Sequence, residues 1–344
     1  MSSLSDYDLI LPQFPSEEEW RQAISELEAL KGVAKDAAIV RVKGLNLLRE
    51  VNEPKATAER LGWLNLWTKT FTALDSAVSA FEYRSDLVLQ MIARCTFEWQ
   101  LHAHVIMDPI SDLHAQEKSN PKVVVLGSRE RSLRETVDRL RAYTAWCLWS
   151  DKDYYEEFVH PRNLAGIWDT SPAKEILADG QRLELYKRFF GSLDVEIDEK
   201  KLAERRQEMK RMFTEKIERI DQWLSDPHLK PWINKIRELS ENNKSKNKGP
   251  VTFFSLFDSS VGRRLKQHGM KFGYAAYTIG SMILHGSTMG QFIMIGTSGL
   301  GPKIGTDDSD VEGAFGDIVS KCNHIFFLLS AIDHFVLKRR ELRR

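Results

Sequence analysis

Apolar residues recur at intervals of three and four along most of this chain, and this spacing constrains the fold more than any other feature. One run places Leu61, Leu64, Trp67, Phe71 and Leu74 on a single helical face. Ser-x-x-Glu capping boxes at 16–19, 132–135 and 309–312 each predict the start of a helix.

Signals for β-strands are few and fall near 121–127 and 292–305. We therefore predict a mainly α protein, a multi-helix bundle with at most a small β hairpin. We expect an N-terminal helical arm over 1–55 and a main helical bundle over 56–344, with an exposed loop near 241–250.

Prolines and polar runs set the expected helix boundaries. Asp108-Pro109 is expected to end the helix that starts near Tyr83, because proline lacks the amide hydrogen that a helix needs. The capping box at 132–135 predicts the next start, and Asp151-Lys-Asp153 is expected to interrupt that helix. A long charged helix is predicted over 199–224.

Composition bounds the function only loosely. The 344 residues include 49 Lys or Arg and 49 Asp or Glu, so the net charge gives no global attraction to nucleic acid or anionic lipid. We see no signal peptide, and the most apolar helix, around 273–285, is too short to cross a bilayer. We expect a cytoplasmic protein, away from membranes, with three reduced and mostly buried cysteines.

The first candidate site is a polar stripe on an apolar helix over 271–285. Tyr274, Tyr277, Ser281 and His285 share one face, and a glycine-rich passage follows them. A histidine one turn from a serine can act as acid, base or phosphate ligand, and the tyrosine hydroxyls can orient a polar ligand. The alternative is that these are core polar groups that hydrogen-bond across helices.

A second stripe places Arg94, Glu98 and His102 one turn apart. Arg94 can hold an anion while Glu98 orients a histidine. The alternative is a buried ion pair that fixes helix register. His104 lies on another face of the same helix, and we expect no role for it.

A third motif, Arg263-x-x-x-x-His268, has the spacing found in a group of ribonucleases of the HEPN superfamily. There the histidine would serve as acid or base toward the ribose hydroxyl, and the arginine would stabilise phosphate charge. The alternative is that this spacing is a chance match, because the chain has nine histidines and many arginines.

Metal and cofactor signatures are absent from the sequence. The sequence has no Cys-x-x-Cys pair, no two Glu-x-x-His pairs of the kind that a di-iron bundle uses, no phosphate-binding loop and no dinucleotide fingerprint. We therefore expect neither a metal nor a cofactor.

Two motifs together carry a family resemblance. Arg94-x-x-x-Glu98, followed downstream by Ser281-x-x-x-His285-Gly286, resembles an uncharacterised family of all-α bacterial proteins, known as a domain of unknown function. The resemblance covers 60–335 and implies no activity. A looser resemblance to HEPN-type proteins implies a helical fold, dimerisation and a role in toxin–antitoxin or anti-phage systems. The Arg-x-x-x-x-His spacing lies upstream of the family-like helix, so Arg263/His268 and Arg94/His285 compete as the functional pair.

We expect a pocket between the Arg94/Glu98 and Ser281/His285 helices. Its expected activity is metal-independent RNA cleavage or nucleotide binding in a defence setting, with RNA or a nucleotide, a second copy or a protein as partner. The alternative is a non-catalytic interaction or scaffold protein whose polar stripes are structural.

Overall fold

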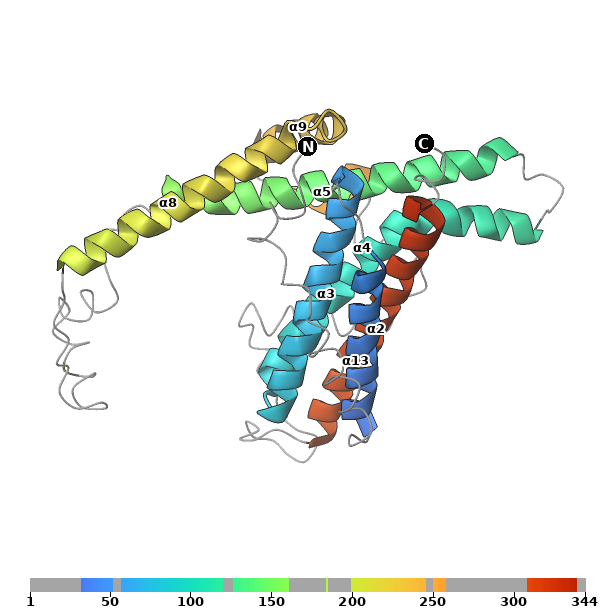
Figure 1. Ribbon diagram of the computed structural model, residues 1–344, viewed down its shortest axis with the longest axis horizontal. Helices are drawn as coiled ribbons and strands as arrows, with labels where there is room; N and C mark the ends of the chain where they lie inside the picture. The colour runs from blue at the N-terminus through green and yellow to red at the C-terminus, as the bar shows by residue number, and fades with distance from the viewer. Residues whose placement is uncertain are drawn as a thin grey trace. The chain divides into compact units, whose positions relative to one another are not determined.

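The computed structural model describes residues 32–51, 57–119, 126–160, 184, 199–245, 250–257 and 308–338. Over these residues it contains α-helices and short helical turns, and no strand (Figure 1). The predicted mainly α helical bundle is thus confirmed for the described residues. Both segments proposed for a β hairpin fall largely or wholly outside them: 121–125 and 292–305 are not described, and Leu126 and Gly127 are helical.

The chain divides into two compact units, residues 1–144 with 238–344, and residues 145–237. The helix α2 (Gly32–Glu50) packs in the first unit against α3 (Ala58–Glu82) and α13 (Asp308–Ile332). The helical arm over 1–55 and the main bundle over 56–344 stay predictions, since 1–31 and 52–56 lie outside the described residues.

The core of the first unit is built around α13. This helix packs most extensively against α4 (Asp86–Ser119), and then against α3 and α2. Figure 1 draws α13 in red, α2 in blue and α4 in teal. Indole groups join the layers, because Trp63 Nε1 donates to the Leu329 carbonyl and Trp67 Nε1 to the Gly44 carbonyl, both at 2.9 Å. Gly44 lets the backbone of α2 approach α13, since a Cβ there would lie 2.7 Å from Phe326 Cζ.

The prediction that α4 ends at Asp108-Pro109 was wrong, because α4 continues through Pro109 to Ser119. Proline cannot donate to the carbonyl four residues earlier, which belongs to Val105. Arg139 Nη1 donates to that Val105 carbonyl at 2.6 Å and also pairs with Asp108 at 3.1 Å. A side chain from another helix thus replaces the hydrogen bond that the proline removes.

Helix α5 (Leu126–Val159) begins before the capping box and runs through Asp151-Lys-Asp153. Both boundaries predicted for it were wrong. Lys152 pairs with Glu156 at 3.6 Å and with Asp221 at 2.5 Å. These ion pairs stabilise the charged residues 151–153 in a helical conformation. Near its middle, α5 touches α3, where Thr144 Oγ1 donates to the Ala58 carbonyl at 2.6 Å.

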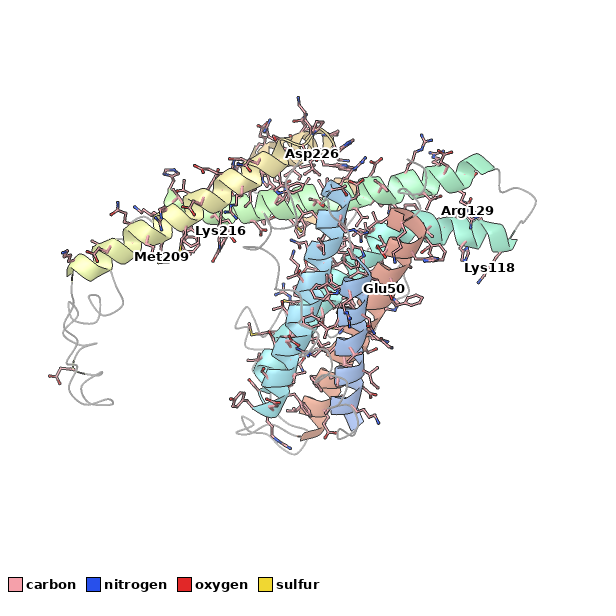
Figure 2. The ribbon with its side chains drawn as sticks, viewed as in Figure 1. Glu50, Lys118, Arg129, Met209, Lys216 and Asp226 are labelled. Atoms are coloured by element: carbon pink, nitrogen blue, oxygen red, sulfur yellow. The ribbon has the colours of Figure 1, made fainter. Side chains whose placement is uncertain are left out.

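In the second unit, α8 (Glu199–Leu224) matches the predicted charged helix. Figure 2 shows its side chains, with Met209 and Lys216 labelled. Phe213 stacks on Tyr155 of α5 with ring centroids 5.5 Å apart, and Lys216 Nζ lies 4.9 Å from the centre of the Tyr155 ring. Aromatic residues therefore join α8 to the last turns of α5.

The next helix, α9 (Lys230–Ser245), is longer than the sequence suggests. Residues 241–245, predicted as part of an exposed loop, are its last turn and are mostly exposed. A short 3-10 helix, η2 (Phe253–Phe257), follows and buries Phe253, Phe254 and Leu256.

At its end, α13 widens into a π-helical segment, η3 (Asp333–Leu337). Asp333 is buried there and pairs with Arg60 of α3 at 2.8 Å, while its other oxygen lies 3.1 Å from Lys338 Nζ. Val311–Leu337 is long and apolar enough to cross a membrane, at a mean hydropathy of 1.2. The segment packs against α2, α3 and α4, and 56% of its most apolar window is buried.

Candidate functional site

Two of the predicted site residues, Arg94 and Glu98, lie one turn apart on α4 and are half-buried. The neighbouring apolar positions Ala93, Phe97 and Leu101 are buried and anchor this face of the helix. Burial raises the pKa of the Glu98 carboxyl above its ordinary value, and the positive charges of Arg94 and Lys69 oppose that rise.

Lys69 belongs to α3, which packs against α4. Its charge acts on Glu98, and its Nζ lies 5.5 Å from the centre of the Tyr143 ring. We call Lys69, Arg94 and Glu98 the cationic–acidic cluster. Two cations beside a desolvated carboxyl can bind an oxyanion and exchange a proton with it.

Cys95 lies between Arg94 and Glu98 in the sequence, and both charges affect the pKa of its thiol. Burial raises the pKa of its thiol, the negative charge of Glu98 raises it further, and Arg94 opposes the rise. Cys147 and Cys322 are buried, and no disulfide joins the three cysteines, as the sequence predicts.

His102, the third residue of the predicted stripe, is 1% exposed. Its ring is surrounded by those of Phe254, Phe253 and Tyr143, with centroids 4.9, 5.1 and 5.5 Å away. Burial, and then the charge of Lys69, lowers the pKa of the imidazole to about 3. His102 is therefore a neutral core residue at neutral pH, and its surroundings favour a packing role over contact with a ligand.

The other predicted site residues lie outside the described part of the chain: Arg263, His268, Tyr274, Tyr277, Ser281 and His285. The structure therefore leaves their roles, and the expected pocket between two polar helices, as predictions.

A second group of polar side chains was not anticipated. His104 of α4 and His324 of α13 face each other, with 3.1 Å between their Nε2 atoms. Burial lowers the pKa of His324, so this ring is neutral at neutral pH. We call these two residues the histidine pair.

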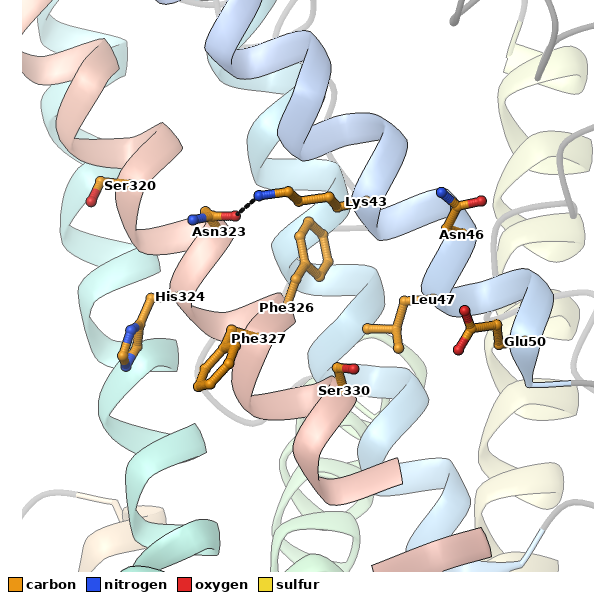
Figure 3. Close-up of a pocket in the computed structure, with 10 residues that line it drawn as sticks. All are labelled: Lys43, Asn46, Leu47, Glu50, Ser320, Asn323, His324, Phe326, Phe327 and Ser330. Carbon is orange, nitrogen blue, oxygen red and sulfur yellow. Dashed lines mark hydrogen bonds between the residues drawn. The ribbon is translucent and has the colours of Figure 1, made fainter. Parts of the chain in front are cut away.

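His324 also lines a groove of about 500 Å³ between α2 and α13 (Figure 3). Lys43 Nζ donates to Asn323 Oδ1 at 3.0 Å across it, and Leu47 and Phe327 give it apolar walls. Phe327 is 67% exposed, so the groove opens to solvent on that side.

Sequence reasoning missed both Lys69 and the histidine pair. Lys69 and His324 belong to helices other than α4, so no spacing along α4 indicates them. His104 was set aside because it lies off the predicted stripe, yet that other face of α4 is the one that meets His324.

Among the residues that the structure describes, no group of three or more His, Cys, Asp or Glu side chains is arranged to hold a metal ion. Comparisons of the chain with models of protein families, with curated proteins and with solved structures find no match.

Proposed function

We propose that the protein binds the phosphate of RNA or of a nucleotide at the cationic–acidic cluster and cleaves RNA there without a metal ion. The observation that supports this is the placement of Glu98, whose pKa burial raises, beside the charges of Arg94 and Lys69. Carboxyls with a raised pKa next to cations are frequent in sites that move protons on anionic substrates. The looser HEPN-type resemblance suggests a toxin or anti-phage setting.

In this proposal Arg94 and Lys69 bind the non-bridging phosphate oxygens and stabilise the charge that develops on them. Glu98 takes or orients a proton of the ribose hydroxyl. A second acid–base group protonates the leaving oxygen, and His285 and His268 are the two candidates for it.

The test is cleavage of a labelled single-stranded RNA by the full-length protein in the presence of EDTA. Arg94→Gln is expected to weaken RNA binding, because it removes a cation but keeps a polar side chain of similar length. Glu98→Gln is expected to lower the cleavage rate by about 100-fold or more, the range for loss of a general acid or base, while binding is retained.

Arg134→Gln is the matched control, since Arg134 is an exposed arginine whose partner Glu130 lies on the same helix. It is expected to leave binding and cleavage unchanged. His285→Ala and His268→Ala, tested separately, decide which histidine acts, and the active one should also abolish toxicity on expression. The proposal is contradicted if Arg94→Gln and Glu98→Gln both cleave RNA at the rate of the parent protein, or if the parent cleaves no RNA.

The second candidate is a non-catalytic interaction protein whose polar stripes fix helix register. It is favoured by the packing of His102, which places one member of the predicted stripe within an aromatic core. In that case Arg94→Gln and Glu98→Gln change the free energy of unfolding, and no RNA binding is found with either the parent or the variants.

A further inference from the structure

The histidine pair has the geometry of a chelate. His104 and His324 come from different helices, and their Nε2 atoms, rather than a ring edge and a ring face, point at each other over 3.1 Å. Their ring centroids are 5.0 Å apart with planes tilted by 33°. Figure 3 shows His324 extending from α13 on the side of α4.

A metal ion needs almost this separation between two ligands. With Zn–N bonds of about 2.0–2.1 Å and tetrahedral angles, two ligand nitrogens of one zinc ion lie about 3.4 Å apart. Opening the pair from 3.1 Å requires a shift of a few tenths of an ångström, which side-chain rotation supplies. We propose that His104 and His324 form a two-histidine site for a divalent transition-metal ion that bridges α4 and α13.

The helices hold the two rings in this position. Leu101, one turn before His104, and Ile325, next to His324, are fully buried, and α4 and α13 are the most extensively packed pair of described helices. The ligand nitrogens are therefore brought together by the folded core before an ion arrives, which lowers the entropic cost of binding.

Binding requires a lone pair on both Nε2 atoms. In the present hydrogen bond one Nε2 carries the proton and the other accepts it. The proton on the donor Nε2 must therefore leave that atom before both nitrogens can bind the ion.

The remaining coordination positions need ligands other than the two histidines. His324 lines the groove between α2 and α13, and no third His, Cys, Asp or Glu of the described residues joins the pair. Water completes the coordination in this proposal. Imidazole nitrogen ligands suit Zn²⁺, Ni²⁺ and Cu²⁺, and affinity is expected to increase from Ni²⁺ to Cu²⁺.

The experiment is calorimetric titration of the full-length protein, freed of any polyhistidine tag, with Zn²⁺ and separately with Ni²⁺. One ion per chain is expected to bind the parent. His104→Gln and His324→Gln are each expected to weaken that binding by at least about tenfold, since losing even a supporting residue of a metal site costs about 10–100-fold. His228→Gln, which changes an exposed histidine of the second unit, is the control and should keep the parental affinity.

Circular dichroism and the unfolding midpoint without metal establish that each variant is folded. If a variant does not fold, a second experiment on the parent protein replaces it. Zn²⁺ should protect His104 and His324, but not His228, from modification by diethyl pyrocarbonate, as measured by peptide mass spectrometry. Unchanged affinity in both folded variants, or equal modification of the pair with and without Zn²⁺, overturns the proposal and leaves a hydrogen bond between the two imidazoles.

The histidine pair shares no residue with the cationic–acidic cluster, so either proposal can fail while the other stands. RNA cleavage in EDTA tests Arg94 and Glu98, whereas metal affinity without RNA tests only the histidine pair.

Discussion

Gly62 is the residue at which α3 and α5 leave no room for a side chain. A Cβ there would lie 2.5 Å from Thr144 Oγ1 and 2.7 Å from the Leu140 carbonyl oxygen. Although alanine favours helices, Gly62→Ala is expected to lower the free energy of unfolding by about 1–3 kcal/mol, because the backbone of α5 must move. Gly313→Ala, in α13, meets nothing within 4 Å and is expected to raise it by up to about 1 kcal/mol. Urea unfolding of both variants measures these changes in stability. Equal changes would show that the close approach of α5 to Gly62 is not what makes Gly62→Ala destabilising.

Glu98 carries a pH dependence of known sign. Its folded-state pKa is raised, so between the ordinary carboxyl pKa and that raised value the folded chain binds more protons than the unfolded chain. Stability contributed by this group is therefore present at low pH and is lost as pH rises through that window.

The matching variant is Glu98→Gln, which cannot ionise. Its free energy of unfolding is expected to be independent of this titration and, at pH 7, at least equal to that of the parent. Denaturant unfolding between pH 4 and pH 8 checks this. A variant less stable than the parent at pH 7 would mean that the ionised carboxyl is stabilising. Greater stability with lost RNA cleavage is the combination expected of a functional residue.

At the scale of whole helices, Arg139 and Pro109 act together. If Arg139 satisfies the Val105 carbonyl that Pro109 leaves without its helical donor, removing the proline should make the arginine less important. Arg139→Met is expected to be more destabilising in the parent than in Pro109→Ala, with a coupling energy of about 0.5–1.5 kcal/mol, the net value of one hydrogen bond. A double-mutant cycle on unfolding free energies measures it. Additive effects would assign the stabilising role of Arg139 to its pairs with Asp108 and Glu135 instead.

The presence of helices could be predicted from the periodicity of the sequence, but the positions of their ends could not. Apolar spacing identified α3, α4 and α13, because burial of one face imposes that spacing whatever the neighbours are. The mixed charges of 199–224 identified α8. The end of α4 was misplaced because the group that replaces the missing hydrogen bond, Arg139, is on α5. The candidate site divides in the same way: Arg94 and Glu98 follow from spacing on one helix, whereas Lys69 and His324 come close only through packing.

At the scale of the whole first unit, one buried ion pair joins residues 273 apart in sequence. Arg60 and Asp333 are each 2% exposed in their side chains. Asp333→Asn leaves the guanidinium buried without its counter-charge and is expected to lower the free energy of unfolding by about 3–5 kcal/mol. The double variant Arg60→Met, Asp333→Leu should recover most of that loss, because it removes both buried charges.

The control for this prediction is Glu130→Gln, which breaks the exposed Arg134–Glu130 pair and should change stability by less than about 1 kcal/mol. Thermal and urea unfolding of the three variants measure these differences. A double variant as unstable as Asp333→Asn would show that the packing around η3, rather than charge, sets the cost.

The position of α13 in the middle of the first unit has a consequence during protein synthesis. α2, α3 and α4 leave the ribosome first, and the helix that covers their apolar faces begins roughly 190 residues after α4 ends, about 10–40 s later at typical translation rates. Through that interval the nascent chain exposes the apolar faces of α2, α3 and α4 that α13 covers in the folded unit. A ribosome stalled before Asp308 would therefore hold a chain that depends on chaperones, and the speed of translation between Ser119 and Asp308 becomes part of what determines the yield of folded protein.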